Sequence, residues 1–197
     1  MIIFIRHGQS TTNARGLLVG RSDPELTERG ERQARALRPY LANVEEVWTS
    51  PLSRARATAM LALPDLDAQE HASFIELDYG CLEGEPMSAL SDEEWRALES
   101  DHERPLGGGE SLASVDARVH LELDRQMTNP MSLLHDPERH LAIVTHVAPI
   151  KSAVVWALGV AGAVVWRTRL DNGSITTIGA RRARPLLVHF NLVPILN

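Results

Sequence analysis

Short apolar runs alternate along the chain with longer segments whose apolar residues recur at helical spacing. The apolar runs predict five strands, at residues 2–5, 44–49, 141–145, 175–178 and 186–190. The last two are expected to form a hairpin or a neighbouring pair. Strands that alternate with helices are typical of an α/β fold with a largely parallel central sheet flanked by helices.

The helical segments are marked by capping residues and by apolar stripes. They are predicted at residues 30–41, 50–63, 92–98, 112–123 and 148–158. Pro39 should kink or shorten the first of them. Ser50 is expected to cap the second, with Pro51 at its first helical position. Ser91 and Ser111 are expected to cap the third and the fourth.

Length and charge limit the possible partners. The 197 residues suffice for a single domain with a substantial core, which we expect to cover residues 1–197. No segment approaches the roughly 20 apolar residues that span a bilayer, and the apolar start is too short for a signal peptide. We therefore expect a cytoplasmic protein without a membrane partner. The net charge of −6 disfavours nucleic acid as a partner.

Cationic and imidazole side chains follow three of the predicted strands. Arg6 and His7 come directly after the first strand, Arg54 lies shortly after the second, and His146 follows the third. In open α/β sheets the ligand crevice lies outside the carboxyl ends of the strands, where helix N-termini favour anions. The pattern therefore predicts that these four side chains converge on one anion site.

A metal site is the rival interpretation of the two histidines. Their neighbours are Arg6, Gly8 and Val147, which supply no further ligands, and fixed guanidinium groups repel a cation. The single cysteine, Cys81, excludes a cysteine-rich metal site. We therefore expect an anion site with neither a metal nor a cofactor.

Six ordered blocks of the sequence carry a family resemblance. They read IRHGQS (5–10, with Asn13 after it), GRSDPELTERG (20–30), TSPLSRA (49–55), ELDYG and LEG (76–84), GGES (108–111) and TH (145–146). Together they resemble the histidine phosphatase superfamily, also called the phosphoglycerate mutase-like family. The resemblance implies a three-layer sandwich with a mostly parallel central sheet flanked by helices.

The resemblance also implies roles for individual residues. His7 would become phosphohistidine, and Glu76 would protonate the leaving oxygen. The other site residues would contact the phosphoryl group or lie beside it: Arg6, Ser10, Asn13, Gly20, Arg54, His146 and Val147. Ser10 could equally cap the helix that follows it. Family members commonly have glycine in place of Val147, but the backbone N–H that would contact phosphate remains.

Phosphoryl transfer sets requirements on the two histidines. His7 must attack as a neutral ring, so its other N–H should donate to a carbonyl group. His146 should be protonated, or at least donate, because its expected task is to bind an oxygen.

The activity expected is hydrolysis of a phosphomonoester of a small phosphorylated metabolite. The alternatives are a cofactor-dependent phosphoglycerate mutase-type phosphotransferase and a non-catalytic protein of the same fold that binds a phosphorylated ligand. The segment 81–145 is compact compared with that of the glycolytic mutases, which favours the phosphatase. The apolar run 186–188 is either a covered strand or the edge of a possible homodimer.

Overall fold

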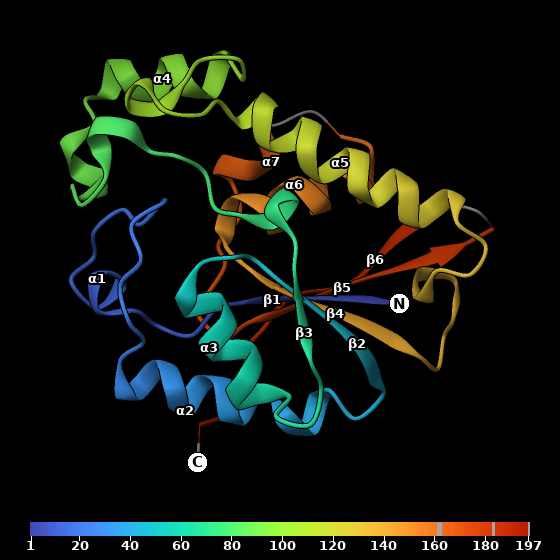
Figure 1. The fold of residues 1–197 in the computed structure, drawn as a ribbon. Coiled ribbons are helices and arrows are strands. Elements are labelled where there is room, and N and C mark those ends of the chain that lie inside the picture. Colours follow the sequence, from blue (N-terminus) through green and yellow to red (C-terminus); the bar gives the residue numbers. More distant parts are fainter. Residues whose placement is uncertain (161–162, 183, 197) are drawn as a thin grey trace.

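A six-stranded sheet forms the centre of the molecule (Figure 1). The computed structural model describes residues 1–160, 163–182 and 184–196. The strands are β1 (Ile2–Arg6), β2 (Val44–Thr49), β3 (Ala68–Glu70), β4 (His140–Thr145), β5 (Ile175–Arg181) and β6 (Arg184–Leu192). Their order is β3-β2-β4-β1-β5-β6. The first four are mutually parallel, and β5 runs antiparallel to both β1 and β6.

Helices cover both faces of the sheet. The α-helices are α1 (Thr11–Ala14), α2 (Glu28–Ala36), α3 (Ser53–Ala62), α4 (Asp92–Ser100), α5 (Leu112–Thr128), α6 (Val147–Leu158) and α7 (Ala163–Trp166). Short 3-10 helices occupy Arg38–Tyr40, Ala72–Phe74, Gly80–Leu82, Met87–Ala89, Leu106–Gly108 and Leu133–His135. In Figure 1, α2 and α3 lie on one side of the sheet, and α5 and α6 lie on the other.

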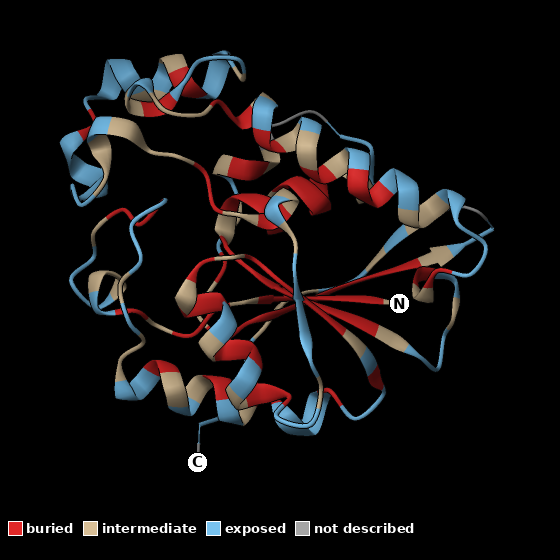
Figure 2. Cartoon of the chain, in the orientation of Figure 1, coloured by how far each residue is buried: buried red, intermediate tan, exposed pale blue. Residues whose placement is uncertain are grey.

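Strand β1 shows why the sheet is buried on both faces. Ile2 and Phe4 belong to the apolar core beneath α5 and α6, whereas Ile3 and Ile5 belong to the core beneath α2 and α3. Successive side chains of a strand point to opposite faces, so an unbroken apolar strand requires a covering layer on each side. Figure 2 shows the inner strands of the sheet largely buried in the middle of the molecule, whereas the edge strands β3 and β6 are mostly exposed or half-buried. The predicted three-layer α/β sandwich is confirmed.

The structure shifts the boundaries of the first long helix. Thr27 caps it by accepting a hydrogen bond from the Gly30 N–H, so α2 begins at Glu28 rather than at residue 30. It ends at Ala36, where the 3-10 turn that contains Pro39 follows. The prediction that this proline shortens the helix is confirmed.

Ser50 does not cap α3, and this prediction was wrong. The helix begins at Ser53, whose backbone N–H donates to both carboxylate oxygens of Asp23, at 2.8 and 3.0 Å. The Ser50 hydroxyl lies instead 2.7 Å from Nε2 of His146. A carboxylate 30 residues away in sequence thus replaces the local cap. The Ser50 hydroxyl contacts His146 instead of the start of the helix.

Other predicted elements are present. Ser91 caps α4 in a capping box with Glu94, and Ser111 caps α5. Strands β5 and β6 pair as an antiparallel hairpin, with β6 at the edge of the sheet. Leu186 and Val188 on that edge are 45% and 40% exposed, and the homodimer stays a prediction. Across the described residues, no helix combines the length and the apolarity that a membrane crossing would need.

Candidate active site

Three adjacent strand ends meet at one edge of the sheet. Strand β4 lies between β1 and β2, and Arg6 at the end of β1 is in register with Thr145 at the end of β4. The residues that follow these strands therefore lie side by side. The rings of His7 and His146 have their centroids 5.0 Å apart.

The hydrogen bonds of His7 indicate which nitrogen carries its proton. Nδ1 lies 2.7 Å from the Gly8 carbonyl oxygen, to which it donates, and Nε2 accepts a 3.3 Å bond from Nε of Arg54. Burial and the charges of Arg54 and Arg6 hold the pKa of His7 well below its ordinary value. The ring is therefore neutral and has a lone pair on Nε2.

Arg54 joins His7 to the loop between α1 and α2. Its side chain is fully buried, and it donates to the carbonyl oxygens of Ser22 at 2.6 Å and of Gly20 at 2.7 Å. Burial lowers the pKa of Arg54, and the charges of Glu76 and Asp23 oppose that shift. Because arginine is the most basic side chain, the group remains a cation beside the His7 ring despite this shift.

His146 and Arg6 each have a buried nitrogen without a partner among the described residues. His146 contacts Ser50 Oγ through Nε2 while its Nδ1 is unpaired, and Arg6 donates Nη1 to the Leu170 carbonyl at 2.6 Å while its Nε is unpaired. A buried polar group without a partner is costly, so these nitrogens favour a ligand that supplies oxygen atoms.

Without a bound phosphate, the pKa of His146 favours the second of the two predicted states, a neutral ring that donates, and the prediction for the phosphate-bound site stays a prediction. Burial, followed by the charge of Arg54, holds its pKa well below the ordinary value, so the ring is neutral. A neutral ring still has one N–H to donate. A bound phosphate would raise this pKa again, because a nearby negative charge favours the protonated form.

The Glu76 carboxylate lies against the N-terminus of α6, the helix that begins directly after His146. Its Oε1 accepts from the N–H groups of Leu77 and Ala148, at 2.9 and 3.1 Å, and its Oε2 accepts from Val147 at 3.1 Å. Burial raises the pKa of Glu76 above its ordinary value, although these N–H groups and the charge of Arg54 oppose the shift. The Val147 N–H is thus already used by Glu76, and phosphate could reach it only if that bond broke.

Ser10 and Asn13 belong to one polar group beneath His7. Ser10 caps α1 in a capping box with Asn13, which makes the capping role predicted as its alternative a structural fact. The amide oxygen of Asn13 also accepts a 3.1 Å bond from Asn172, which donates to the His7 carbonyl at 3.2 Å as well.

Gly20 lies where no side chain would fit. A Cβ at this position would lie 2.6 Å from both the Leu77 carbonyl oxygen and Oε2 of Glu83. The Gly20 N–H donates to both carboxylate oxygens of Glu83, at 2.9 Å each, and its carbonyl accepts from Arg54. Gly20 therefore contributes to the site only through its backbone groups, and Glu83 fixes the loop that contains Gly20.

Sequence reasoning missed three polar residues of the site. Ser50 contacts His146, Asn172 ties His7 to Asn13, and the Thr58 hydroxyl accepts a 3.0 Å bond from the Gly8 N–H. Ser50 belongs to the block TSPLSRA (49–55) and Thr58 lies just after it, so this part of the sequence carried a signal for both. Asn172 is 165 residues from His7 in sequence, and no local pattern marks it.

The cluster is suited to a phosphoryl group. It combines two guanidinium groups, which can bind oxygen atoms in a bidentate way, with a neutral imidazole whose lone pair accepts only a 3.3 Å bond from Arg54. The described residues include no group of three or more His, Cys, Asp or Glu side chains with the arrangement of a metal site.

Comparison with known proteins agrees with this geometry. The model of the histidine phosphatase superfamily (branch 1) matches residues 2–193. The chain belongs to this superfamily. It is 29% identical to phosphoserine phosphatase 1 of Hydrogenobacter thermophilus over 97% of this chain and 92% of the relative.

Two further relatives indicate the range of activities in the superfamily. A 2,3-bisphosphoglycerate-dependent phosphoglycerate mutase of Methylocella silvestris is 36% identical, over 60% of this chain and 64% of the mutase. The structure of a mutant phosphoserine phosphatase of Entamoeba histolytica in complex with phosphoserine superposes with a TM-score of 0.82 and 28% identity, over 96% of this chain and 95% of that one. The superfamily member described here is an enzyme of the phosphomonoesterase type.

Proposed function

We propose that the protein hydrolyses the phosphomonoester of a small phosphorylated metabolite through a phosphohistidine on His7. The observation that carries the proposal is the pair of hydrogen bonds on the His7 ring. Nδ1 donates to the Gly8 carbonyl, so Nε2 carries the lone pair, which accepts a long 3.3 Å bond from Arg54 and can attack phosphorus once that bond breaks. A neutral, oriented imidazole is what nucleophilic attack on phosphorus requires.

The first step forms the bond between His7 Nε2 and phosphorus and breaks the ester P–O bond. The leaving oxygen takes a proton from the Glu76 carboxyl group, whose raised pKa helps it to hold that proton near neutral pH. Arg6, Arg54 and the free N–H of His146 stabilise the negative charge on the phosphoryl oxygens.

The second step returns the enzyme to its starting state. Water attacks phosphorus and gives a proton to the Glu76 carboxylate, and the N–P bond breaks. Inorganic phosphate leaves, and the electron pair returns to Nε2 of His7. The Gly8 carbonyl supports this cycle because it stabilises the cationic phosphorylated ring through the Nδ1–H.

A phosphatase is favoured over a mutase by the length of one segment, not by the extent of the similarity. Phosphoserine phosphatase 1 matches 97% of the chain, but a probable phosphoglycerate mutase of Cronobacter sakazakii matches 90% of it, so coverage does not separate the two activities. The compact segment 81–145 carries the preference instead. A mutase must protect its phosphohistidine from water, and the longer insertion associated with that protection does not fit within the compact segment 81–145.

The test is phosphate release from p-nitrophenyl phosphate in buffer that contains EDTA. We expect turnover that the chelator does not abolish and that His7→Ala removes. His189→Ala, at an exposed position of β6, is the matched control and should retain the wild-type rate. Full activity of His7→Ala would reject the phosphohistidine, and the absence of turnover in the wild-type protein would reject the phosphatase.

A further inference from the structure

A cavity of about 210 Å³ adjoins the proposed phosphate site. Its wall includes Leu77, Val147 and Ala148, which are the three residues whose backbone N–H groups hold the Glu76 carboxylate. An ester oxygen that receives a proton from Glu76 would therefore direct the organic part of the substrate toward this cavity.

The lining of the cavity is mostly apolar. Two indole rings, of Trp95 from α4 and Trp166 from α7, meet edge to face with their centroids 5.2 Å apart. Apart from these indoles and the three residues that hold Glu76, the wall consists of Tyr79, Met87, Glu99, Leu106, Leu112, Lys151 and Val165. Such a wall favours ligands that bury carbon rather than hydroxyl groups.

The two charged residues of the wall do not make it an anion site. Glu99 and Lys151 have opposite charges, and Nζ of Lys151 already donates to the Val165 carbonyl at 2.5 Å. Burial lowers the pKa of Lys151 to about 8, so this group is still mostly a cation at pH 7, but the negative charge of Glu99 in the same wall opposes its attraction for an anion. A carboxylate on the substrate would therefore gain less here than beside a lysine alone.

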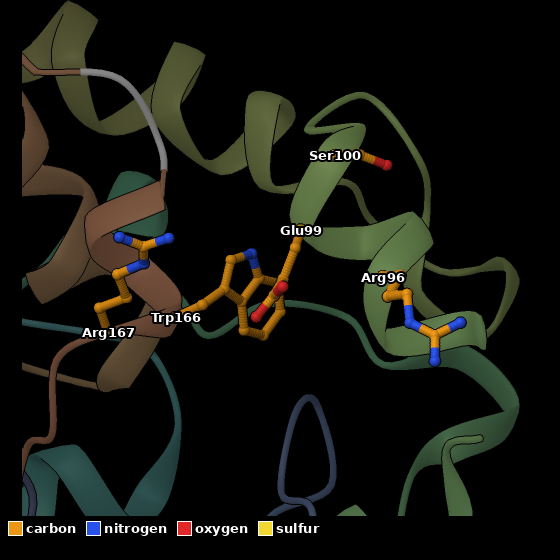
Figure 3. A pocket seen from close by; sticks show the side chains of 5 residues that line it. All are labelled: Arg96, Glu99, Ser100, Trp166 and Arg167. Carbon is orange, nitrogen blue, oxygen red and sulfur yellow. The ribbon is translucent and has the colours of Figure 1, made fainter. Parts of the chain in front are cut away.

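The apolar region ends at a polar hollow. This outer hollow of about 230 Å³ shares Glu99 and Trp166 with the cavity, and its lining is completed by Arg96, Ser100 and Arg167 (Figure 3). In Figure 3, Trp166 from α7 and Glu99 from α4 reach toward each other, with the two arginines on opposite sides. The apolar part of a ligand should therefore have a limited length.

We infer that the substrate is a phosphomonoester whose alcohol is a short apolar group, buried between Trp95, Trp166 and Met87. This inference rests on the proposed phosphatase activity. It names the class of leaving group that the site prefers, in contrast to the polar, carboxylate-bearing phosphoserine bound by the Entamoeba relative.

The test is kcat/KM for n-alkyl phosphates from ethyl to hexyl, with p-nitrophenyl phosphate as the activity control. These alkyl esters have nearly the same leaving-group chemistry, so chain length isolates apolar contact. We expect kcat/KM to rise by roughly fourfold for each methylene that becomes buried, and to stop rising when the chain reaches Glu99. We also expect phosphoserine to be a poorer substrate than butyl phosphate.

A pair of matched variants locates the effect. Met87→Gln should lower the ratio of kcat/KM for hexyl to that for ethyl phosphate by several fold, whereas Met131→Gln, 85% exposed outside the cavity, should leave the ratio unchanged. Turnover of p-nitrophenyl phosphate with equal kcat/KM across the alkyl series would overturn the inference and leave the phosphatase in place. A lack of turnover with every ester would remove both.

Discussion

Arg54 is the residue whose donors are most fully committed within the site. It contacts the ring of His7 and two loop carbonyls from a completely buried position. Its guanidinium therefore sets the distance between the loop and the nucleophile, and it also supplies positive charge for the transferred phosphoryl group.

Arg54→Ala should lower kcat/KM for p-nitrophenyl phosphate by at least about 100-fold, or ~3 kcal/mol, because a charged contact to the transition state is lost. Arg54→Lys should recover only part of this loss, since a lysine cannot reproduce the fork that binds both carbonyls. Arg56→Ala on the same helix is the matched control, because Arg56 is exposed and pairs with Glu70. Similar kinetic parameters for the Arg54 and Arg56 variants would refute this role.

The buried histidines should make folding sensitive to acid. The folded protein keeps His7 neutral, whereas the unfolded chain binds a proton at His7 below its ordinary pKa of about 6.5. Unfolding therefore takes up a proton. The full stability of the folded protein is present above pH 6.5, and part of it is lost as the pH falls below that value. The slope is at most about 1.4 kcal/mol per pH unit for each such histidine.

His7→Gln should consequently lose less stability than the wild-type protein between pH 7 and pH 5. Urea denaturation at several pH values measures this difference. His189→Gln, at an exposed position, is the control for the loss of an imidazole. A wild-type pH profile that His7→Gln leaves unchanged would show that the folded His7 is not held neutral.

At the scale of elements, the loop that contains Gly20 is held by α3 on one side and by Glu83 on the other. Asp23 caps α3, Arg54 of α3 binds the Gly20 carbonyl, and Glu83 accepts from the Gly20 N–H. The Ser22 hydroxyl also donates to Glu83. The position of the loop therefore depends on three separate segments of the chain.

Gly20→Ala tests this dependence, because the new Cβ would lie 2.6 Å from the Leu77 carbonyl oxygen and the loop would have to move. We expect kcat/KM to fall at least about tenfold and the free energy of unfolding to fall by roughly 1–3 kcal/mol, as for other overpacked sites. Gly179→Ala in β5 is the control, because the closest neighbour of its Cβ would lie at an ordinary 3.5 Å. Wild-type kinetics for Gly20→Ala would mean that the loop position does not matter for catalysis.

Elements with local causes were predictable from the sequence. The apolar run of β1, the capping box of Ser91 and the helix break near Pro39 all depend on residues within a few positions of one another. The grouping of Arg6, His7 and His146 was also predictable, because parallel strands bring their carboxyl ends to one edge. The exposed three-residue strand β3 has no apolar run and was missed.

Features that depend on distant partners were not predictable. Nothing near Ser50 indicates that Asp23 caps α3 in its place, and nothing near Asn172 indicates the contact with His7. The lowered pKa of His146 was also not predictable, because it depends on burial, which only the packed structure defines. Pairing across the chain, rather than local pattern, decides each of these features.

At the scale of the whole molecule, the proposed site is built on the centre of the sheet. Its residues follow β1, β2 and β4, which are neighbours in the sheet, and Glu76 binds the N-terminus of α6. The two apolar cores meet these strands from opposite faces. The part of the site at these strand ends can therefore come apart only when the central strands separate, which is global unfolding.

Inorganic phosphate, the product of the proposed reaction, should consequently stabilise the whole fold. A ligand that binds only the folded state adds RT ln(1 + [L]/Kd), or about 2.7 kcal/mol at 100 times Kd. The inhibition constant of phosphate in the p-nitrophenyl phosphate assay supplies Kd, so the stabilisation measured by urea denaturation can be compared with a calculated value. Arg54→Ala should abolish the effect, and Arg56→Ala should retain it. A different outcome is inhibition by phosphate without the calculated stabilisation. It would mean either that phosphate also binds the unfolded chain or that the site can open while the sheet remains intact. Both explanations contradict the coupling of the site to the central strands.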